Sequence, residues 1–395
     1  MSHVCDAVFL LAGAVLLCIM VYLVFLAAAS LAPPRTRSAR GDRLTRFAIV
    51  VPAHDEERMI GTTLANLASL DYPADLCEVF VIADNCSDGT AEMAARHGVT
   101  CWERKDDERK GKGFALQWAF ARLLREVDHD AFVIVDADSV LDPRFLRFMS
   151  QRVQEGARAI QGYYDILSPE KSVIGSLTYL GFVLSRKLRY QGRTRLGWSS
   201  NLLGNGMCFT REIIQRFGWC STSIVEDIEC GMILRLNGVR VDFAPEAKVC
   251  SEFPDTFGKS KTQRGRWDIG KLRVARKYFL RLVREGLARG DLSYLDGAME
   301  LAIPPFSIYV AMAVAGAGLF FALDFKGFNI NGVLWASLVA LLALYVLLGL
   351  LLARSSWRIY AKLLYAPFFI MWRVWLVGYG LLMGEHDSWV KTERN

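Results

Sequence analysis

Two aspartates spaced one residue apart, Asp136 and Asp138, are the carboxylates in this sequence best suited to bind a metal ion. They end the apolar run AFVIVDAD at residues 131–138, which is typical of a strand buried on both faces. Side chains alternate along an extended chain, so both carboxylates are expected on one side of it. A hard divalent cation with oxygen ligands stabilises such a pair of like charges. The pair therefore predicts a Mg²⁺ or Mn²⁺ site for a phosphate-bearing substrate, and the alternative is that both carboxylates only open the loop before the next helix.

The elements that must position this pair are alternating strands and helices from residue 47 onward. We predict strands at residues 47–53, 78–84, 100–103, 131–138 and 159–163, and helices at residues 59–70, 90–97 and 111–127. Strands separated by helices predict a mainly parallel, doubly wound α/β sheet with right-handed crossovers. Acidic residues follow three of the strands, at residues 55–57, at Asp84 and at Asp136. Because such sheets bind ligands at the carboxyl ends of their strands, these residues are expected at one edge.

The composition indicates a soluble domain attached to membrane segments. The chain has 395 residues, of which 53% are hydrophobic, and a net charge of +6. Basic residues gather near the apolar segments and at residues 259–284, which suits a membrane surface or phosphorylated substrates better than nucleic acid. The nine cysteines form no C-x-x-C pair, which argues against a disulfide framework or a zinc site and for a reducing cytoplasmic compartment. The five histidines lack the spacing of zinc protease or hydrolase sites.

Three long apolar segments are predicted to cross the membrane, at residues 7–32, 301–323 and 332–353. The first is long enough for a hydrocarbon core of ~30 Å. A cleaved signal peptide is the alternative, but the segment lacks a basic start and its apolar run is too long. Arginines at and after residue 35 follow it, so the positive-inside rule places Met1 outside and the following domain in the cytoplasm. This predicts a multi-pass protein of the inner (cytoplasmic) membrane.

The apolar segment at residues 358–384 is ambiguous. It is long and aromatic but contains Lys362 and Arg373, and a basic residue near the centre of a spanning helix is costly. We therefore predict an interfacial helix with a cytoplasmic tail, and a fourth span is the alternative. The predicted division of the chain is an N-terminal anchor, a catalytic domain, an interface segment, two spanning helices and a C-terminal segment, at residues 1–34, 35–257, 258–298, 299–354 and 355–395.

Seven short motifs resemble those of one enzyme family. In chain order they are VVPAHDE (50–56), VIADNCSDGT (81–90), GKGFAL (111–116), VDAD (135–138), SSNLLGNGMCF (199–209), VED (225–227) and QRGRW (263–267). Together they resemble the inverting family 2 glycosyltransferases of the GT-A fold. QRGRW is similar to the Q-x-x-R-W box of the membrane-bound members, which are relatives of cellulose, chitin, hyaluronan and poly-N-acetylglucosamine synthases and of ceramide glucosyltransferase. The resemblance implies a Rossmann-like α/β domain in the cytoplasm with transmembrane helices at both ends.

The resemblance implies a set of residues that bind a UDP-sugar and a divalent metal. The donor-binding residues it implies are Ala53, His54, Glu56, Asp84, Lys112 and Asp136. The first three would flank the uracil and ribose, and Asp84 would accept a hydrogen bond from the uracil. Lys112 would support the nucleotide, although a solvated loop lysine is the alternative. Asp136 would face the ribose and diphosphate, and Asp138 would ligate the Mg²⁺ or Mn²⁺ that bridges the two phosphates.

The same resemblance assigns the catalytic and acceptor residues. Asp227 would be the base that takes the proton of the acceptor hydroxyl, with Glu226 positioning it. Both precede a predicted helix at residues 228–236, so plain helix capping is the alternative. Arg266 would stabilise the departing UDP, Trp267 would stack on the acceptor sugar and Gln263 would hydrogen-bond to it. The other interpretation of this box is a basic amphipathic helix at residues 262–287 anchored in lipid headgroups, and the two are compatible.

These residues predict a metal-dependent hexosyltransferase that moves glucose or N-acetylglucosamine from a UDP-sugar to a lipid or lipid-linked acceptor. A processive synthase of an exopolysaccharide is the alternative, and its pore would then be shared among the subunits of a homo-oligomer. A protein of another class, an inactive relative that only binds nucleotide-sugars, would be expected to lack a carboxylate. Asp84, Asp136, Asp138 and Asp227 are all present.

Overall fold

The computed structural model describes residues 3–33, 43–323 and 329–383. Within these residues, eight strands form one sheet in the order β3-β2-β1-β4-β7-β6-β8-β5. The strands are β1 (Phe47–Ala53), β2 (Cys77–Asp84), β3 (Thr100–Arg104), β4 (Ala131–Ile134), β5 (Ser139–Leu141), β6 (Ala159–Ile166), β7 (Met207–Thr210) and β8 (Val241–Ser251). Strands β1 to β4 pair in parallel, as predicted. Strand β7 is antiparallel to both β4 and β6, and β5 is antiparallel to β8, so the complete sheet is mixed.

Helices cover both faces of the sheet and form two separate cores. The helices are α2 (Glu57–Ala68), α3 (Thr90–Arg96), α4 (Lys112–Glu126), α5 (Phe145–Gln154), α8 (Arg211–Phe217) and α9 (Glu226–Leu236), with a short turn η1 (Ala74–Leu76) before β2. Strand β1 shows why the apolar runs are unbroken. Ile49 and Val51 pack in the core under α2 and α5, whereas Ala48 and Val50 pack in the core under α4, α8 and α9. Alternate side chains enter opposite cores, so every position of the strand is apolar.

The strand that precedes the aspartate pair is shorter than predicted. We expected a strand through residue 138, but β4 ends at Ile134 and the chain turns before β5 begins at Ser139. The backbone N–H of Asp136 donates to Asn205 Oδ1 (3.1 Å), and Ser139 pairs with Ser251 in β8. Asp136 and Asp138 therefore lie in a turn. Their side-chain directions are not set by the alternation of side chains along a strand, which the sequence predicted.

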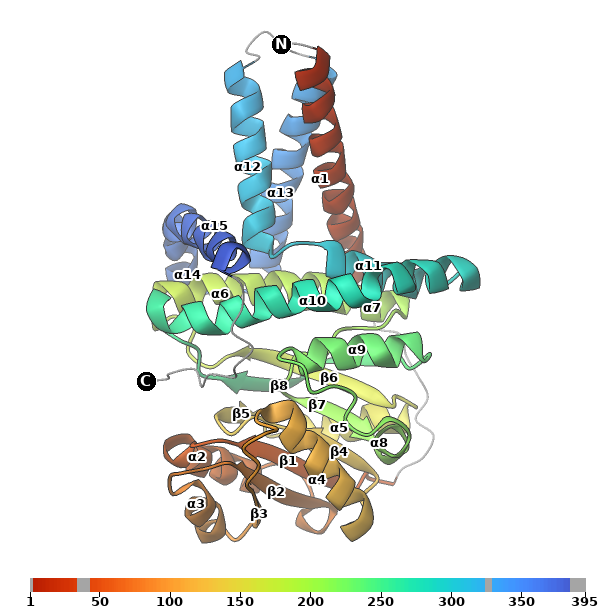
Figure 1. Cartoon of the computed structure of the whole chain (residues 1–395), viewed down its shortest axis with the longest axis vertical. Helices are drawn as coiled ribbons and strands as arrows, with labels where there is room; N and C mark the ends of the chain where they lie inside the picture. Colours follow the sequence, from red (N-terminus) through yellow and green to blue (C-terminus); the bar gives the residue numbers. More distant parts are fainter. Residues whose placement is uncertain (1–2, 34–42, 324–328, 384–395) are drawn as a thin grey trace.

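A layer of helices separates the sheet from the membrane helices (Figure 1). It consists of α6 (Val173–Val183), the π-helical η2 (Leu184–Tyr190), α7 (Gln191–Leu196), α10 (Phe257–Arg289) and α11 (Leu292–Ala302). Helix α10 extends past both ends of the predicted 262–287. It begins after Thr256, whose side chain accepts a hydrogen bond from the N–H of Lys259, and it ends at Gly290 in the left-handed conformation (φ 62°).

Four helices among the described residues are long and apolar enough to cross a membrane, and the chain is accordingly a membrane protein. Helices α1 (His3–Ser30), α12 (Phe306–Leu323) and α13 (Ile330–Ala353) lie side by side and extend away from the sheet (Figure 1). The expected span from residue 301 begins later, since α11 ends at Ala302 and two prolines precede α12. The arginines between residues 35 and 40 and the tail after residue 383 lie outside the described residues.

The ambiguous C-terminal segment forms α14 (Trp357–Ala361), η3 (Lys362–Tyr365) and α15 (Ala366–Met383). Its length and composition make it the fourth candidate span. Figure 1 shows α15 beside the lower end of α12 and close to α10. Its axis therefore does not run alongside α1, α12 and α13. Arg373, whose charge would be costly in a spanning helix, is 3% exposed. It forms an ion pair with Asp268 of α10 (2.9 Å). This arginine therefore points into the protein, where a carboxylate compensates its charge.

A buried ionic network joins membrane helix α1 to α9. Asp296 of α11 accepts hydrogen bonds from Tyr22 of α1 (2.6 Å), Arg193 of α7 (2.8 Å) and Arg235 of α9 (3.0 Å). Arg193 is fully buried and also binds Glu300 (2.7 Å). Removing one partner of such a network leaves an uncompensated buried charge, which is costly. The network thus fixes α9 relative to the membrane helices.

Candidate active site

One cavity of about 1510 Å³ runs from the carboxyl ends of β1, β2 and β4, past α9 and α10, to the membrane helices α12 and α13. All twelve residues predicted from the sequence line it: Ala53, His54, Glu56, Asp84, Lys112, Asp136, Asp138, Glu226, Asp227, Gln263, Arg266 and Trp267. Of the acidic stretch after β1, only Glu56 contributes to the lining. Asp55 accepts a hydrogen bond from the N–H of Ser87 (2.7 Å), and Glu57 accepts one from the N–H of Gly89 (3.1 Å).

Two turns after β1 and β2 shape the end of the cavity nearest the sheet. Asp55 and Asn85 both have positive φ, 53° and 52°, which is uncommon for residues other than glycine. Nδ1 of His54 lies 2.7 Å from the carbonyl oxygen of Asp84. Asn85 accepts a hydrogen bond from the N–H of Asp106 (2.8 Å) and donates to the carbonyl of the same residue (3.2 Å). The first contact holds the two turns together, and the other two join the turn after β2 to the loop after β3.

Asp84 has a buried partner that the motif analysis missed. Arg104 donates to the carboxylate of Asp84, and both side chains are nearly buried, with 6% and 7% exposed. Burial raises the pKa of Asp84, and Arg104 offsets part of this effect. Strand register supplies the signal that could have identified Arg104, because β2 and β3 are parallel and pair Asp84 with Arg104.

Lys112 connects the end of the cavity nearest the sheet to the loop at residues 199–206. It is the first residue of α4, after Gly111 with φ 115°. Its Nζ forms an ion pair with Asp136 and donates to the carbonyl of Gly204 (2.6 Å). Burial by itself lowers the pKa of Lys112, but Asp136 and Glu226 outweigh this effect, and the pKa is raised. Lys112 is therefore held as a cation beside the aspartate pair, unlike a solvated loop lysine.

Asn205 holds the loop at residues 199–206 in place. It lies within the motif SSNLLGNGMCF, but the sequence analysis assigned it no role. The amide of Asn205 donates to Ser139 Oγ (2.8 Å) and Ser251 Oγ (3.0 Å), and its oxygen accepts from the N–H of Asp136. Asn205 is fully buried, so these hydrogen bonds form away from water. The turn that carries Asp136 is thereby tied to β5 and β8.

The residues around Asp138 fit a hard divalent cation. Asp138 is only 3% exposed and lines the cavity next to Asp136, and carboxylate oxygens are the ligands that Mg²⁺ and Mn²⁺ prefer. Among the described residues, neither aspartate belongs to a group of three closely spaced protein ligands. A cation held here would accordingly take its remaining ligands from substrate phosphates and water, as Mg²⁺ commonly does.

Glu226 and Asp227 are the first two residues of α9, whereas we expected them just before the helix. Asp227 Oδ1 accepts a hydrogen bond from the N–H of Ile228 (2.8 Å), and the positive end of the helix dipole favours a carboxylate here. Burial raises the pKa of both side chains, and the charge of Asp227 raises that of Glu226 further. As the pH rises, Asp227 therefore ionises before Glu226.

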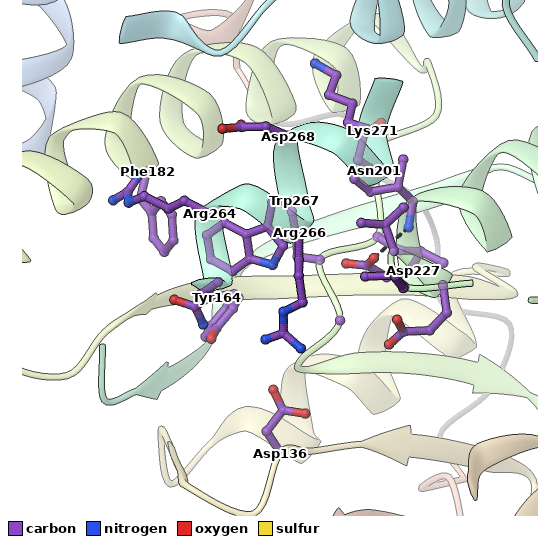
Figure 2. Close-up of a pocket in the computed structure, with 18 of the residues that line it drawn as sticks. Asp136, Tyr164, Phe182, Asn201, Asp227, Arg264, Arg266, Trp267, Asp268 and Lys271 are labelled. Carbon is purple, nitrogen blue, oxygen red and sulfur yellow. Dashed lines mark hydrogen bonds between the residues drawn. The ribbon is translucent and has the colours of Figure 1, made fainter. Parts of the chain in front are cut away.

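Helix α10 supplies the wall that faces these carboxylates. Figure 2 shows Arg266 extending toward Asp136, with Trp267 between Asp227 on one side and Arg264 on the other. The Trp267 ring meets Phe253 edge to face, with centroids 6.4 Å apart. Gln263 lies one turn before Trp267 and lines the same cavity. The Q-x-x-R-W box therefore faces the cavity.

Comparison with known proteins agrees with this geometry. The model of the family described as "Glycosyltransferase like family 2" matches residues 45–270. The chain is a family 2 glycosyltransferase. The probable glycosyltransferase YdaM of Bacillus subtilis (strain 168) is 25% identical to it over 374 residues, covering 89% of this chain and 87% of YdaM. The poly-beta-1,6-N-acetyl-D-glucosamine synthase of Staphylococcus aureus (strain COL) is 25% identical over 238 residues, covering 58% of this chain and 55% of the synthase.

A solved structure confirms the predicted fold of this glycosyltransferase. The mannosyltransferase PcManGT from Pyrobaculum calidifontis, solved with GDP-Man and Mn²⁺, superposes with a TM-score of 0.61 at 20% sequence identity. The match covers 93% of the glycosyltransferase described here and 99% of PcManGT. It therefore extends over the membrane helices as well as the GT-A domain, and the predicted combination of the two is confirmed.

The cavity of this glycosyltransferase has opposite charge at its two ends. Toward the sheet, its lining carries eight carboxylates: Glu56, Asp84, Asp107, Glu108, Asp136, Asp138, Glu226 and Asp227. Four cations accompany them: Lys105, Lys110, Lys112 and Arg266. The excess of acid suits an incoming divalent cation with a nucleotide. Toward the membrane, the charged side chains of the lining are mostly basic.

Proposed function

We propose that this glycosyltransferase moves a hexose, of the glucose or N-acetylglucosamine type, from a UDP-sugar to a lipid or lipid-linked acceptor, with inversion at the anomeric carbon. Catalysis would take place at the cytoplasmic face of the inner membrane, in the domain at residues 35–257. One observation carries the proposal: Asp138 and Asp227 line a single cavity that also reaches α12 and α13. A donor entering from the sheet and an acceptor entering from the membrane can meet there.

In this proposal Asp227 is the general base. The acceptor oxygen attacks the anomeric carbon, the bond from that carbon to the UDP oxygen breaks, and the acceptor proton passes to Asp227. Burial and the charge of Asp227 raise the pKa of Glu226, so Glu226 holds its proton more tightly than Asp227 and would position it. Arg266 points toward the donor end and would stabilise the charge that develops on the departing UDP.

Asp138, with Asp136 beside it, would hold the Mg²⁺ or Mn²⁺ ion. When bound, such a cation neutralises the negative charge of the diphosphate as it leaves. The Mn²⁺ in the structure of PcManGT supports this assignment. Trp267 would stack on the acceptor sugar, with Gln263 as its hydrogen-bonding neighbour.

Processive synthesis of a polysaccharide is the second candidate, because a poly-beta-1,6-N-acetyl-D-glucosamine synthase is among the relatives. This chain spans about half of that relative's length. A polymer would require a channel through the membrane, within one chain or among several copies in a homo-oligomer. Single transfer needs only the cavity described above, so we prefer it.

A UDP-release assay tests the proposal. The purified full chain would be offered UDP-Glc, UDP-GlcNAc, UDP-Gal and UDP-GlcA with Mg²⁺ or Mn²⁺ and membrane lipid. We expect turnover with UDP-Glc or UDP-GlcNAc, and the size of the product separates a glycolipid from a polymer. Asp138→Ala and Asp227→Asn should each abolish transfer while the protein stays folded in the membrane. Normal turnover by both variants would refute the mechanism.

A further inference from the structure

The half of the cavity beyond Trp267 lies among the membrane and interface helices and is largely apolar. Helices α6, α12, α13 and α15 line it with aliphatic side chains: Leu177, Leu180, Val310, Val346, Leu350 and Ile370. Helices α12 and α13 are candidate membrane spans, so this part of the lining reaches the depth of the lipid chains. An apolar chamber at this depth suits a hydrocarbon chain.

Basic side chains also line this part of the cavity. Five cations line it: Arg186, Arg189, Arg264, Lys271 and Arg373. Only two carboxylates lie among them, and each already has a partner. Asp268 pairs with Arg373 (2.9 Å), and Glu300 pairs with Arg189 (3.1 Å). Within the part of the chain that the structure describes, the other three cations have no carboxylate within ion-pair distance.

Arg186 is the most unusual of these cations because it is buried without a counter-ion. Its side chain belongs to η2 and is only 4% exposed. Its Nη1 donates to Ser185 Oγ (3.2 Å), its guanidinium lies 3.5 Å from the ring centroid of Phe182, and its Nε has no hydrogen-bond partner. Burial lowers its pKa. The guanidinium belongs to a residue that lines the cavity, and a desolvated cation without a direct counter-ion is stabilised by an anion.

Arg264 and Lys271 repeat this pattern on α10. Arg264 Nε donates to Ser260 Oγ (2.9 Å), and its guanidinium also binds Thr178. Burial and the nearby Arg373 lower the pKa of Arg264 to about 9. Lys271 Nζ donates to the carbonyl of Ile303 (2.8 Å), and burial lowers its pKa. These hydrogen-bond partners are neutral, and the carboxylates that act on the two cations, Asp268 on both and Glu300 on Lys271, form no ion pair with them, so an anionic group would stabilise both.

One cavity therefore combines an apolar chamber lined by membrane and interface helices, a set of basic side chains, Trp267 and Asp227. We infer that the acceptor is a lipid in which a phosphate joins the hydrocarbon to the hydroxyl-bearing group, with that phosphate bound by Arg186 and Arg264, which contact α6 one turn apart, at Phe182 and Thr178. The inference rests on the proposed function and adds the chemistry of the acceptor. A neutral glycolipid would leave these two cations without a direct counter-ion, and a phosphate without a lipid would leave the apolar chamber unfilled.

Binding to the full chain in an uncharged polyoxyethylene detergent tests this inference with three probes. Dihexanoyl phosphatidylinositol carries the chain, the phosphate and a hydroxyl-bearing ring. Octyl glucoside carries a chain and a ring without phosphate, and glycerophosphoinositol carries the phosphate and ring without chains. Titration calorimetry should give the phosphatidylinositol a Kd at least about tenfold lower than either of the others, since both a charge-assisted contact and apolar burial contribute.

Variants locate the binding site. Arg186→Gln and Arg264→Gln should each weaken phosphatidylinositol binding by at least about tenfold, because each removes a charged hydrogen-bond donor, and Arg264→Lys should restore part of it. Arg276→Gln is the matched control, since Arg276 lies on the same helix α10 and is exposed. Binding of UDP with Mn²⁺ should stay within about twofold in every variant, which also shows that the variants fold.

Three results would overturn the inference: octyl glucoside binding as tightly as the phosphatidylinositol, glycerophosphoinositol doing so, or both arginine variants retaining lipid binding while UDP and Mn²⁺ still bind. The first would indicate a neutral lipid acceptor, and the second a free phosphate compound. If the wild-type chain failed to bind UDP with Mn²⁺ at all, the proposed function itself would fail. The two failures are therefore distinguishable.

Discussion

Replacing Lys112 by methionine should shift the pH dependence of catalysis toward higher pH. Burial raises the pKa of Asp227, and the charge of Lys112 lowers it. The pKa of Asp227 therefore depends on both effects. A general base acts only when it is deprotonated. Loss of the lysine charge therefore raises the pKa of Asp227 further and moves the acid limb of kcat/KM upward, because kcat/KM reports the free enzyme.

The size of this shift follows from the position of Gly204. A Cβ atom placed there would lie 3.3 Å from an Asp227 carboxylate oxygen and 3.9 Å from the Lys112 nitrogen, so the two charges lie within about 7 Å of each other. At about 7 Å, unit charges interact by about 2.4 kcal/mol at an effective dielectric constant of about 20, and by about 0.6 kcal/mol in water. One pKa unit corresponds to about 1.36 kcal/mol, so the acid limb should rise by about 0.4 to 1.7 pH units.

The assay is UDP release at subsaturating donor between about pH 4.5 and 9 for wild type and variants. Lys112→Arg keeps the charge and should keep the acid limb near its wild-type position, although the maximal rate changes. Lys171→Met removes an exposed lysine outside the cavity and serves as control for net charge. An acid limb that stays in place or moves to lower pH in Lys112→Met would refute the assignment of Asp227 as the titrating base.

Three further predictions concern the metal, the acceptor and the buried ion pair. A chelator should abolish UDP release. Added Mg²⁺ or Mn²⁺ should restore UDP release in wild type but not in Asp138→Ala. Activity that survives chelation would contradict the metal site. Trp267→Ala should raise the KM for the acceptor by about tenfold and leave the KM for the donor unchanged. Trp267→Phe should retain most of the activity. Equal effects on both KM values would exclude the stacking role. Arg104→Met should destabilise the protein by about 3–5 kcal/mol, because it leaves the Asp84 carboxylate buried without its cation. The midpoint of denaturation measures this, the added change Asp84→Asn should recover part of the loss, and an unaltered midpoint would contradict it.

Much of the α/β domain was predictable because its signals are local. Strand β1 shows this most clearly, since seven consecutive residues from Phe47 to Ala53 match the prediction. Its flanks contain turn residues, and its apolar side chains fill two cores. The motif residues were equally accessible, because each follows a strand or begins a helix at a spacing that the family shares.

Other features depended on contacts between distant segments. The strand predicted for residues 131–138 ends at Ile134 because the N–H of Asp136 binds Asn205, which lies 69 positions along the chain. No window around Asp136 contains that partner. Arg373 illustrates the same limit. Its charge argues against a membrane-spanning helix when only the local sequence is considered, but Asp268 compensates that charge from another helix.

The sequence by itself determined the order of strands and helices, the family, and the residue types that the chemistry needs, because backbone propensity and apolar periodicity act over a few neighbouring residues. Only the tertiary structure decided which of these residues share a cavity and which charges in it lack a partner. It places Asp227 and Lys112 on either side of Gly204, and it leaves Arg186 buried without an ion-pair partner. Electrostatic energies depend on distance and burial in space, and separation along the chain encodes neither.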